Sequence, residues 1–288
     1  TSLFLTGSIL SAPYCVAEEV TLQHKGLTLN ANLELADETP FQRIFLITHG
    51  TLAHNGMEII NNWQSLLLDE GVSSLAINLS LGQDNRHGMY DCPSLHTHKH
   101  TDAVEEIGNW VNWLKEKGSE QIILAGHSRG GNQTAWFSVE NKDPVVHAQI
   151  LLAPQTWSEA EEVADYTKRY QQDLAPLLEK AHSLPKDEVL EKTNFIYCAE
   201  TQVTAGSVIG YYEPDTRLDT PTLLKQSHIP TLVFSGSEDT TVSDLTEKMA
   251  AVGNAQVKHT EIEGADHFFR DLYMDEVLEY SLEFLDGL

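Results

Sequence analysis

Residues 121–131 read QIILAGHSRGG, an apolar run that leads into a serine with a glycine two positions away on each side. The apolar run predicts a buried strand, and the spacing of apolar residues from Arg129 to Asn141 predicts a helix directly after it. A G-x-S-x-G sequence between a strand and a helix indicates a sharp turn that exposes the serine, because its glycines leave room where side chains would collide. Ser128 is therefore the candidate nucleophile.

Further apolar runs occur on both sides of this motif, and helix-length segments separate them. Such runs are typical of strands buried on both faces, and their alternation with helices predicts an α/β fold with a mostly parallel central sheet. Alternating apolar residues from Val20 to Leu35 predict an antiparallel hairpin before it. The predicted strands of the parallel sheet are Arg43–Thr48, Val72–Leu79, Gln121–Ala125, Val145–Ala153, Thr231–Ser235 and Val257–Ile262. The predicted helices are Met57–Glu70, Thr101–Lys117, Arg129–Asn141, Val242–Ala251 and Asp271–Leu285, the last with Leu272, Val277, Leu278, Leu282 and Leu285 inward.

With this motif and this order of elements, the chain after Val20 resembles the α/β-hydrolase superfamily, in its serine esterase and lipase-like branch. The resemblance implies an acid after a later strand and a histidine after the last one. Asp239 and His267 occupy those places, so the implied catalytic triad is Ser128, His267 and Asp239. Glu238 is a local rival for Asp239, which on its own could simply cap a helix.

The chemistry of such a triad is acyl transfer. A serine hydroxyl becomes nucleophilic when a neutral imidazole takes its proton, and a carboxylate fixes that imidazole. The resemblance places two oxyanion-hole donors at the backbone amides of Thr51 and Arg129. The Thr51 hydroxyl is either a third donor or a solvated group, and His49 is expected to support the turn. This chemistry requires no cofactor and no metal.

The composition restricts the partners. The chain has 288 residues, with 43 acidic and 18 basic side chains and a formal charge of -25, so a phosphate backbone would be repelled and nucleic acid is excluded as an expected partner. Residues 1–17 are uncharged and resemble a truncated export signal that is cut before Glu18, which predicts a periplasmic or secreted protein. The alternative is an ordinary terminal strand or a frayed segment. No other segment is expected to insert stably in a membrane, and the oligomeric state stays open.

About seventy residues separate two of the predicted strands, more than a strand-to-helix connection uses. The predicted organisation is a signal at 1–17, a hydrolase core at 18–155 and 230–288, and a cap insertion at 156–229. Its first half is predicted to be helical and acidic, and its second half, Phe195–Pro221, irregular. Acidic side chains disfavour anions, and Tyr197, Tyr211 and Tyr212 suit a compact ligand, so the expected substrate is a small, uncharged ester.

Two smaller groups of residues remain. Cys92 and Cys198 are an even pair if Cys15 leaves with the signal; they are either buried thiols or a disulfide, and export favours the disulfide. His96, His98 and His100 alternate in a polar segment, where a metal site is conceivable, although a loop near the mouth of the active site is the preferred interpretation.

These features favour a serine hydrolase that cleaves carboxylic esters through an acyl-enzyme. The ester class is the default of the resemblance, and a thioesterase, amidase or peptidase of the same fold is an alternative. A non-catalytic binding protein that keeps the fold is the alternative from another class.

Overall fold

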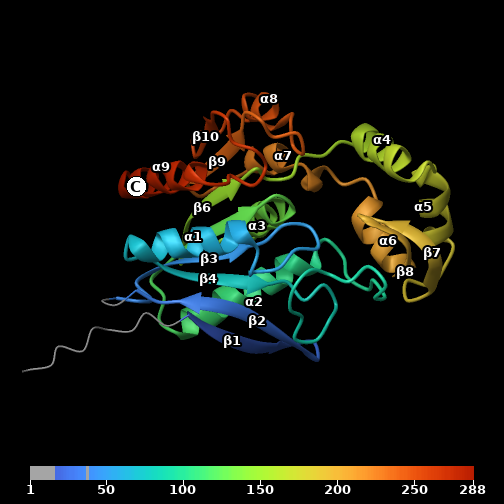
Figure 1. Cartoon of the computed structure of the whole chain (residues 1–288), viewed down its shortest axis with the longest axis horizontal. Helices are drawn as coiled ribbons and strands as arrows, with labels where there is room; N and C mark the ends of the chain where they lie inside the picture. Colours follow the sequence, from blue (N-terminus) through green and yellow to red (C-terminus); the bar gives the residue numbers. More distant parts are fainter. Residues whose placement is uncertain (1–16, 37–38) are drawn as a thin grey trace, which may run out of the picture.

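The computed structural model describes residues 17–36 and 39–288, which form one large sheet with helices on both faces (Figure 1). The sheet has eight strands in the order β1-β2-β4-β3-β5-β6-β9-β10. The first three in this order pair antiparallel, and all other neighbours pair parallel. The strands are β1 Ala17–His24, β2 Leu27–Glu34, β3 Arg43–Thr48, β4 Ser73–Asn78, β5 Gln121–His127, β6 Val146–Leu152, β9 Thr231–Gly236 and β10 Val257–Ile262. The mostly parallel sheet and the hairpin before it are confirmed.

Strand β3 shows why continuous apolar runs form the centre of this sheet. Successive side chains point to opposite faces. Phe45 and Ile47 belong to one hydrophobic core, whereas Ile44 and Leu46 belong to the other. Helices α1 Glu58–Asp69 and α9 Leu272–Asp286 pack into the first core, and α2 Asp102–Glu116 packs into the second. Both faces of the strand are therefore covered.

The helices flanking the sheet agree with the predicted spans except for one helix, and one residue of α9 points in another direction than expected. The predicted helix Val242–Ala251 is shorter in the structure, where α8 spans Leu245–Met249. The expectation that Leu272 points inward is wrong, since its side chain is 80% exposed, whereas Val277 and Leu278 are buried. Leu272 is the first residue of α9, and the first buried residue of this helix is Met274.

The segment between β6 and β9 carries its own small sheet and helices. Its helical first half is confirmed, whereas the irregular second half is wrong. The elements are α4 Glu159–Tyr170, α5 Leu174–His182, β7 Val189–Phe195, β8 Cys198–Thr204, α6 Ala205–Tyr212, the 3-10 helix η1 Thr216–Leu218 and α7 Thr220–Leu224. Of these, α4, α5, α6, β7 and β8 gather at one end of the molecule, whereas α7 lies beside β9 (Figure 1).

Two glycines, a residue type typical of turns, lie in a helix in this second half. Gly206 and Gly210 lie inside α6, where they permit close packing and do not mark turns. A Cβ atom on Gly206 would lie 2.9 Å from the carbonyl oxygen of Lys186, and one on Gly210 would lie 2.8 Å from the Lys99 side chain. Thr204 caps this helix, because its Oγ1 accepts from the amide of Ser207.

The disulfide between Cys92 and Cys198 is confirmed, with Cα atoms 5.3 Å apart. It joins the segment before α2 to strand β8. Beside it, His96 donates from its amide to Gln202 O and accepts at its carbonyl from Thr204 N, each over 2.9 Å. The small sheet is thus fastened covalently and by backbone hydrogen bonds to the chain that precedes α2.

The predicted export signal lies outside the described residues, apart from Ala17, which begins β1. Within the described ranges, every helix is too short or too polar to cross a bilayer.

Candidate active site

Ser128 lies on the sharp turn between β5 and α3 Arg129–Glu140, with φ 57° and ψ −125°. A positive φ is costly for a residue with a side chain and recurs at functional sites. Both motif glycines are needed here, since a Cβ on Gly126 would lie 2.6 Å from Gly130 O and one on Gly130 would lie 2.2 Å from His49 O. The local sequence therefore permits the turn that carries Ser128 to the sheet edge.

The three residues of the predicted triad meet at this edge. His267 Nε2 lies 3.0 Å from Ser128 Oγ, and His267 Nδ1 lies 2.7 Å from Asp239 Oδ2. His267 follows β10 and Asp239 follows β9, so the parallel sheet brings both to the carboxyl end of β5. The rival Glu238 is exposed to solvent.

Asp239 is held by the backbone as well as by His267. Its Oδ1 accepts from the amides of Thr241, over 2.6 Å, and Val242, over 3.1 Å. Burial acts to raise the pKa of Asp239, but the hydrogen bond and charge of His267, with these two amides, bring that pKa below its usual range. Asp239 is therefore held as a carboxylate that faces His267 Nδ1.

Thr51 and Arg129 line the polar side of the site together with Ser128. Thr51 follows β3, and Arg129 is the first residue of α3, where backbone amides point out of the helix. Among the described residues, neither amide donates to a carbonyl in a turn or loop hydrogen bond. The Thr51 hydroxyl is not simply solvated, since its Oγ1 accepts from Arg129 Nε over 3.0 Å.

Two buried histidines support these loops. Leu79 N donates to His49 Nε2 over 3.1 Å, so His49 Nδ1 donates to Gly50 O, and the expected supporting role of His49 is confirmed. His127, which the sequence analysis did not single out, contacts His267 O through its Nε2 at 2.9 Å. Burial lowers the pKa of each to about 3, so both stay neutral. The one feature of the sequence that could have indicated this role is the position of His127 directly before the nucleophile.

The histidine row at 96–100 lies in the interior, so the expected loop at the mouth of the site is only partly right. His96, His98 and His100 are at most 1% exposed. His98 Nδ1 lies 2.8 Å from Tyr211 OH, and His100 Nε2 lies 2.8 Å from Asn132 Oδ1. Within residues 17–36 and 39–288, no group of His, Cys, Asp or Glu is arranged to hold a metal ion. The row instead packs beneath side chains that line the active-site cavity.

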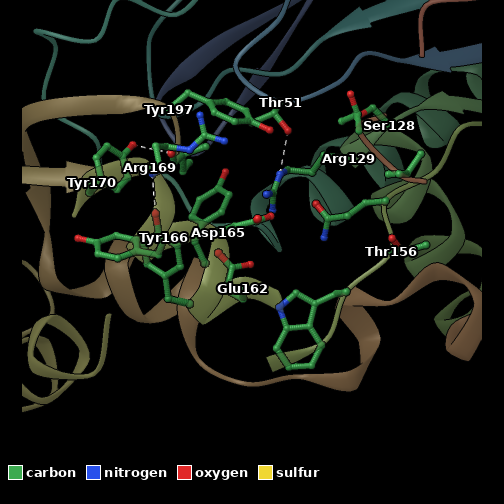
Figure 2. Close-up of a pocket in the computed structure, with 17 residues that line it drawn as sticks. Thr51, Ser128, Arg129, Thr156, Glu162, Asp165, Tyr166, Arg169, Tyr170 and Tyr197 are labelled. Atoms are coloured by element: carbon green, nitrogen blue, oxygen red, sulfur yellow. Dashed lines mark hydrogen bonds between the residues drawn. The ribbon is translucent and has the colours of Figure 1, made fainter. Parts of the chain in front are cut away.

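Two cavities meet at Ser128. The polar one, of about 140 Å³, lies between the core and α4 (Figure 2), and Tyr197, Tyr211 and Tyr212 line it as predicted. Four charged side chains also line it, namely Glu162 and Asp165 of the acidic cap helix, as expected, and the side chains of Arg129 and Arg169, which were not expected there. The second cavity, of about 260 Å³, is mainly apolar and is lined by His267 with Met57, Ile59, Ile60, Met89 and Phe268.

Solved structures with the same fold have low sequence identity to this chain. Est1E from Butyrivibrio proteoclasticus is 18% identical over 93% of this chain and 99% of its own, with a TM-score of 0.63. The alpha/beta hydrolase GrgF from Penicillium sp. sh18 is 18% identical over 94% and 98%, with a TM-score of 0.68. Dienelactone hydrolase from Anabaena variabilis is 15% identical over 95% and 98%, with a TM-score of 0.59.

No curated protein sequence matches this chain. The sequence model of the alpha/beta hydrolase family, in contrast, matches residues 45–279, a span that holds Ser128, Asp239 and His267. The fold and this match lead to one conclusion: the chain belongs to the alpha/beta hydrolase family.

Proposed function

We propose that this protein is a serine hydrolase that cleaves carboxylic esters, with Ser128 as nucleophile, His267 as general base and acid, and Asp239 as the residue that orients His267. The observation that carries the proposal is the continuous hydrogen-bonded row from Asp239 Oδ2 through His267 to Ser128 Oγ, with distances of 2.7 and 3.0 Å. A base within hydrogen-bond reach of a hydroxyl is the geometry that nucleophilic catalysis needs.

The reaction follows from this row. His267 Nε2 takes the proton of Ser128 as Oγ bonds to the ester carbon, and the backbone amides of Thr51 and Arg129 stabilise the negative carbonyl oxygen. The tetrahedral species collapses, the alcohol leaves with the proton from His267, and an acyl group stays on Ser128. Water then gives its proton to His267, attacks the acyl carbon and releases the acid.

One observation supports ester cleavage over other acyl transfers, and a second agrees with an ester without distinguishing it from a thioester or an amide. Among the structures with this fold, Est1E has been solved with ferulic acid bound, and another is a dienelactone hydrolase. The space on both sides of Ser128 suits a substrate with two parts, as an ester of a small acid and a small alcohol has.

We also propose that the protein is exported, because a disulfide such as Cys92–Cys198 persists in oxidising compartments.

The test is a panel of ester, thioester and amide substrates that share one acyl group. Wild type is expected to hydrolyse the ester fastest, and Ser128→Ala to lose turnover by about 10⁶-fold, since removal of a serine nucleophile costs that order. A fluorophosphonate probe should label the wild type at Ser128 and leave Ser128→Ala unlabelled. Faster cleavage of the thioester or amide would move the protein to that class, and turnover retained in Ser128→Ala would remove the proposed nucleophile.

A further inference from the structure

The two cavities that meet at Ser128 offer different surroundings to the two parts of an ester. Ser128, Thr51 and Tyr197 line both. Of the described residues, His267 lines the apolar cavity and not the polar one. The position of His267 therefore distinguishes the two sides of the nucleophile.

The position of the proton donor decides which part of the ester lies in which cavity. The leaving alcohol oxygen takes its proton from His267 Nε2, so it must come within hydrogen-bond distance of that atom. The alcohol part then lies in the apolar cavity, beside His267 and Phe268. The acyl part, which stays on Ser128, extends the other way into the polar cavity. The lining of the polar cavity consequently decides which acyl groups fit.

Arg129 is the most firmly fixed charge in the polar cavity. Its Nε donates to Thr51 Oγ1 over 3.0 Å and its Nη1 to His100 Nδ1 over 3.2 Å, while the guanidinium carbon lies 5.3 Å from the centre of the Tyr211 ring. A guanidinium group only donates, so His100 Nδ1 accepts and its Nε2 donates to Asn132 Oδ1. The side chain is thus held in place before any ligand arrives.

One edge of this guanidinium remains available. Among the described residues, Nη2 of Arg129 has no hydrogen-bond partner, and Arg129 forms no ion pair. Figure 2 shows Arg129 reaching from the side of Ser128 and Thr51 toward Glu162 and Asp165 on α4. Within the described part of the chain, no ion pair within 4.0 Å joins these carboxylates to Arg129 or Arg169. The cavity therefore offers a guanidinium edge without a hydrogen-bond partner and two carboxylates that are not joined to either arginine.

The balance of charge selects the chemistry of the group that binds there. Two arginines and two carboxylates line the polar cavity, so their formal charges cancel. A carboxylate on the acyl group would be attracted by Arg129 but repelled by Glu162 and Asp165. An ammonium group would be attracted by the two carboxylates but repelled by Arg129. A hydroxyl both donates and accepts, and it carries no charge to be opposed.

We infer that the preferred substrates are esters of hydroxylated, uncharged acids with apolar alcohols, and that Arg129 is the specificity-determining residue that binds the acyl hydroxyl. This inference rests on the proposed function, because it takes Ser128 and His267 as the reacting groups. It also makes the small, uncharged ester expected from the sequence more specific, since it states which part of the ester is polar.

The first test uses two isomeric esters in which the parts are exchanged. Benzyl 3-hydroxypropanoate has a polar acyl group and an apolar alcohol, and 2-hydroxyethyl phenylacetate has the reverse. Benzyl butanoate replaces the hydroxyl of the first by a methyl group. We expect kcat/KM for benzyl 3-hydroxypropanoate to exceed both others by about tenfold, the size of one hydrogen bond to a charged group. Preference for the exchanged isomer, or no effect of the hydroxyl, would overturn the inference.

The second test asks whether Arg129 carries this preference. Arg129→Met keeps the length of the side chain and removes its donors, so the ratio of kcat/KM for benzyl 3-hydroxypropanoate to that for benzyl butanoate should fall about tenfold toward one. Arg43→Met is the matched control, because Arg43 begins β3 at the opposite end of the sheet, and it should keep the wild-type ratio. A ratio unchanged in Arg129→Met would assign the preference elsewhere.

A binding measurement separates this inference from the proposed function. Calorimetry on Ser128→Ala with the two benzyl esters does not depend on turnover, and about tenfold tighter binding of the hydroxylated ester is expected. Equal binding, or binding of neither ester, would overturn the inference even if the wild type cleaves esters. Tighter binding of the hydroxylated ester by a protein that hydrolyses no ester would uphold the polar cavity and refute the proposed reaction.

Discussion

His127 Nε2 lies 2.9 Å from the backbone carbonyl oxygen of His267, so the residue directly before the candidate nucleophile fastens the loop of the candidate base. The two rings also lie near each other, with centroids 4.8 Å apart. Burial, followed by the charge of His267, lowers the pKa of His127 to about 3. His127 is therefore neutral, and its Nε2–H is the donor of this bond.

Replacement of His127 should consequently misplace His267. We expect His127→Leu to lower kcat by tenfold to about 10²-fold, because small displacements of a catalytic group carry costs of that order. The unfolding free energy should fall by about 1–3 kcal/mol, since a buried carbonyl loses its donor. His127→Gln can still donate and should recover part of kcat. Kinetics beside denaturant unfolding would check this, and a destabilised His127→Leu with wild-type kcat would contradict it.

Asp239→Asn tests the orienting role of the carboxylate. The amide oxygen can still accept from the amides of Thr241 and Val242, so the loop should keep its shape. The amide nitrogen then faces His267 Nδ1 and favours the wrong tautomer, which should lower kcat by about 10⁴-fold, as the same change does in a serine protease triad. The control is Glu238→Gln at the exposed neighbour, which should leave kcat near the wild-type value. Equal loss in both variants would point to damage of the loop.

The G-x-S-x-G motif indicated Ser128, and the resemblance to the α/β-hydrolase superfamily implied Asp239 and His267; the parallel sheet explains why the three lie together. A parallel sheet collects the carboxyl ends of its strands at one edge, so residues after β5, β9 and β10 meet there once the strands are identified. Continuous apolar runs such as Arg43–Thr48 identified those strands, because a strand covered on both faces has no polar alternation.

Contacts between distant segments could not be predicted in the same way. The guanidinium of Arg129 meets Thr51 and His100 only after the sheet has formed, and nothing near Arg129 in sequence indicates either partner. Gly206 and Gly210 have the composition of turn residues, yet they lie in α6 because Lys186 and Lys99 pack against them. Local sequence shows that a glycine is present and does not show which neighbour requires it.

Buried neutral histidines should make the protein sensitive to acid. His49, His98, His100 and His127 have pKa values lowered to about 3, and His96 to about 4, chiefly by burial. In the unfolded chain each pKa is about 6.5, so below that pH the unfolded state binds protons that the folded state does not. This contribution to stability is complete above about pH 6.5 and is lost as the pH falls toward the folded pKa values.

Each such histidine can contribute up to about 1.4 kcal/mol per pH unit, so the unfolding free energy should fall by several kcal/mol between pH 6.5 and pH 5. Denaturant unfolding at a series of pH values measures this slope. His100→Gln should reduce the slope by about one proton. An unfolding free energy that is flat from pH 7 to pH 5 would mean that these histidines are protonated in the folded protein.

The disulfide offers the last prediction, since it closes a long loop and also holds the wall of the polar cavity. Cys92 and Cys198 are 106 residues apart in sequence, and a cross-link of that span stabilises a protein by about 2–5 kcal/mol through the unfolded state. Strand β8, which begins at Cys198, leads into α6 with Tyr211 and Tyr212 of the polar cavity. Loss of the bond should therefore affect both stability and the acyl side of the substrate site.

We expect Cys92→Ala/Cys198→Ala to lower the unfolding free energy by about 2–5 kcal/mol. Because the hydrogen bonds of His96 with Gln202 and Thr204 remain, the protein should still fold. A reducing agent should lower the Tm of wild type and leave that of the double variant unchanged, which separates the bond from general effects of the reductant. Thiol titration of unfolded, unreduced protein that begins at Glu18 should find no free thiol. Two free thiols would contradict the bond and would remove the support that it gives to export.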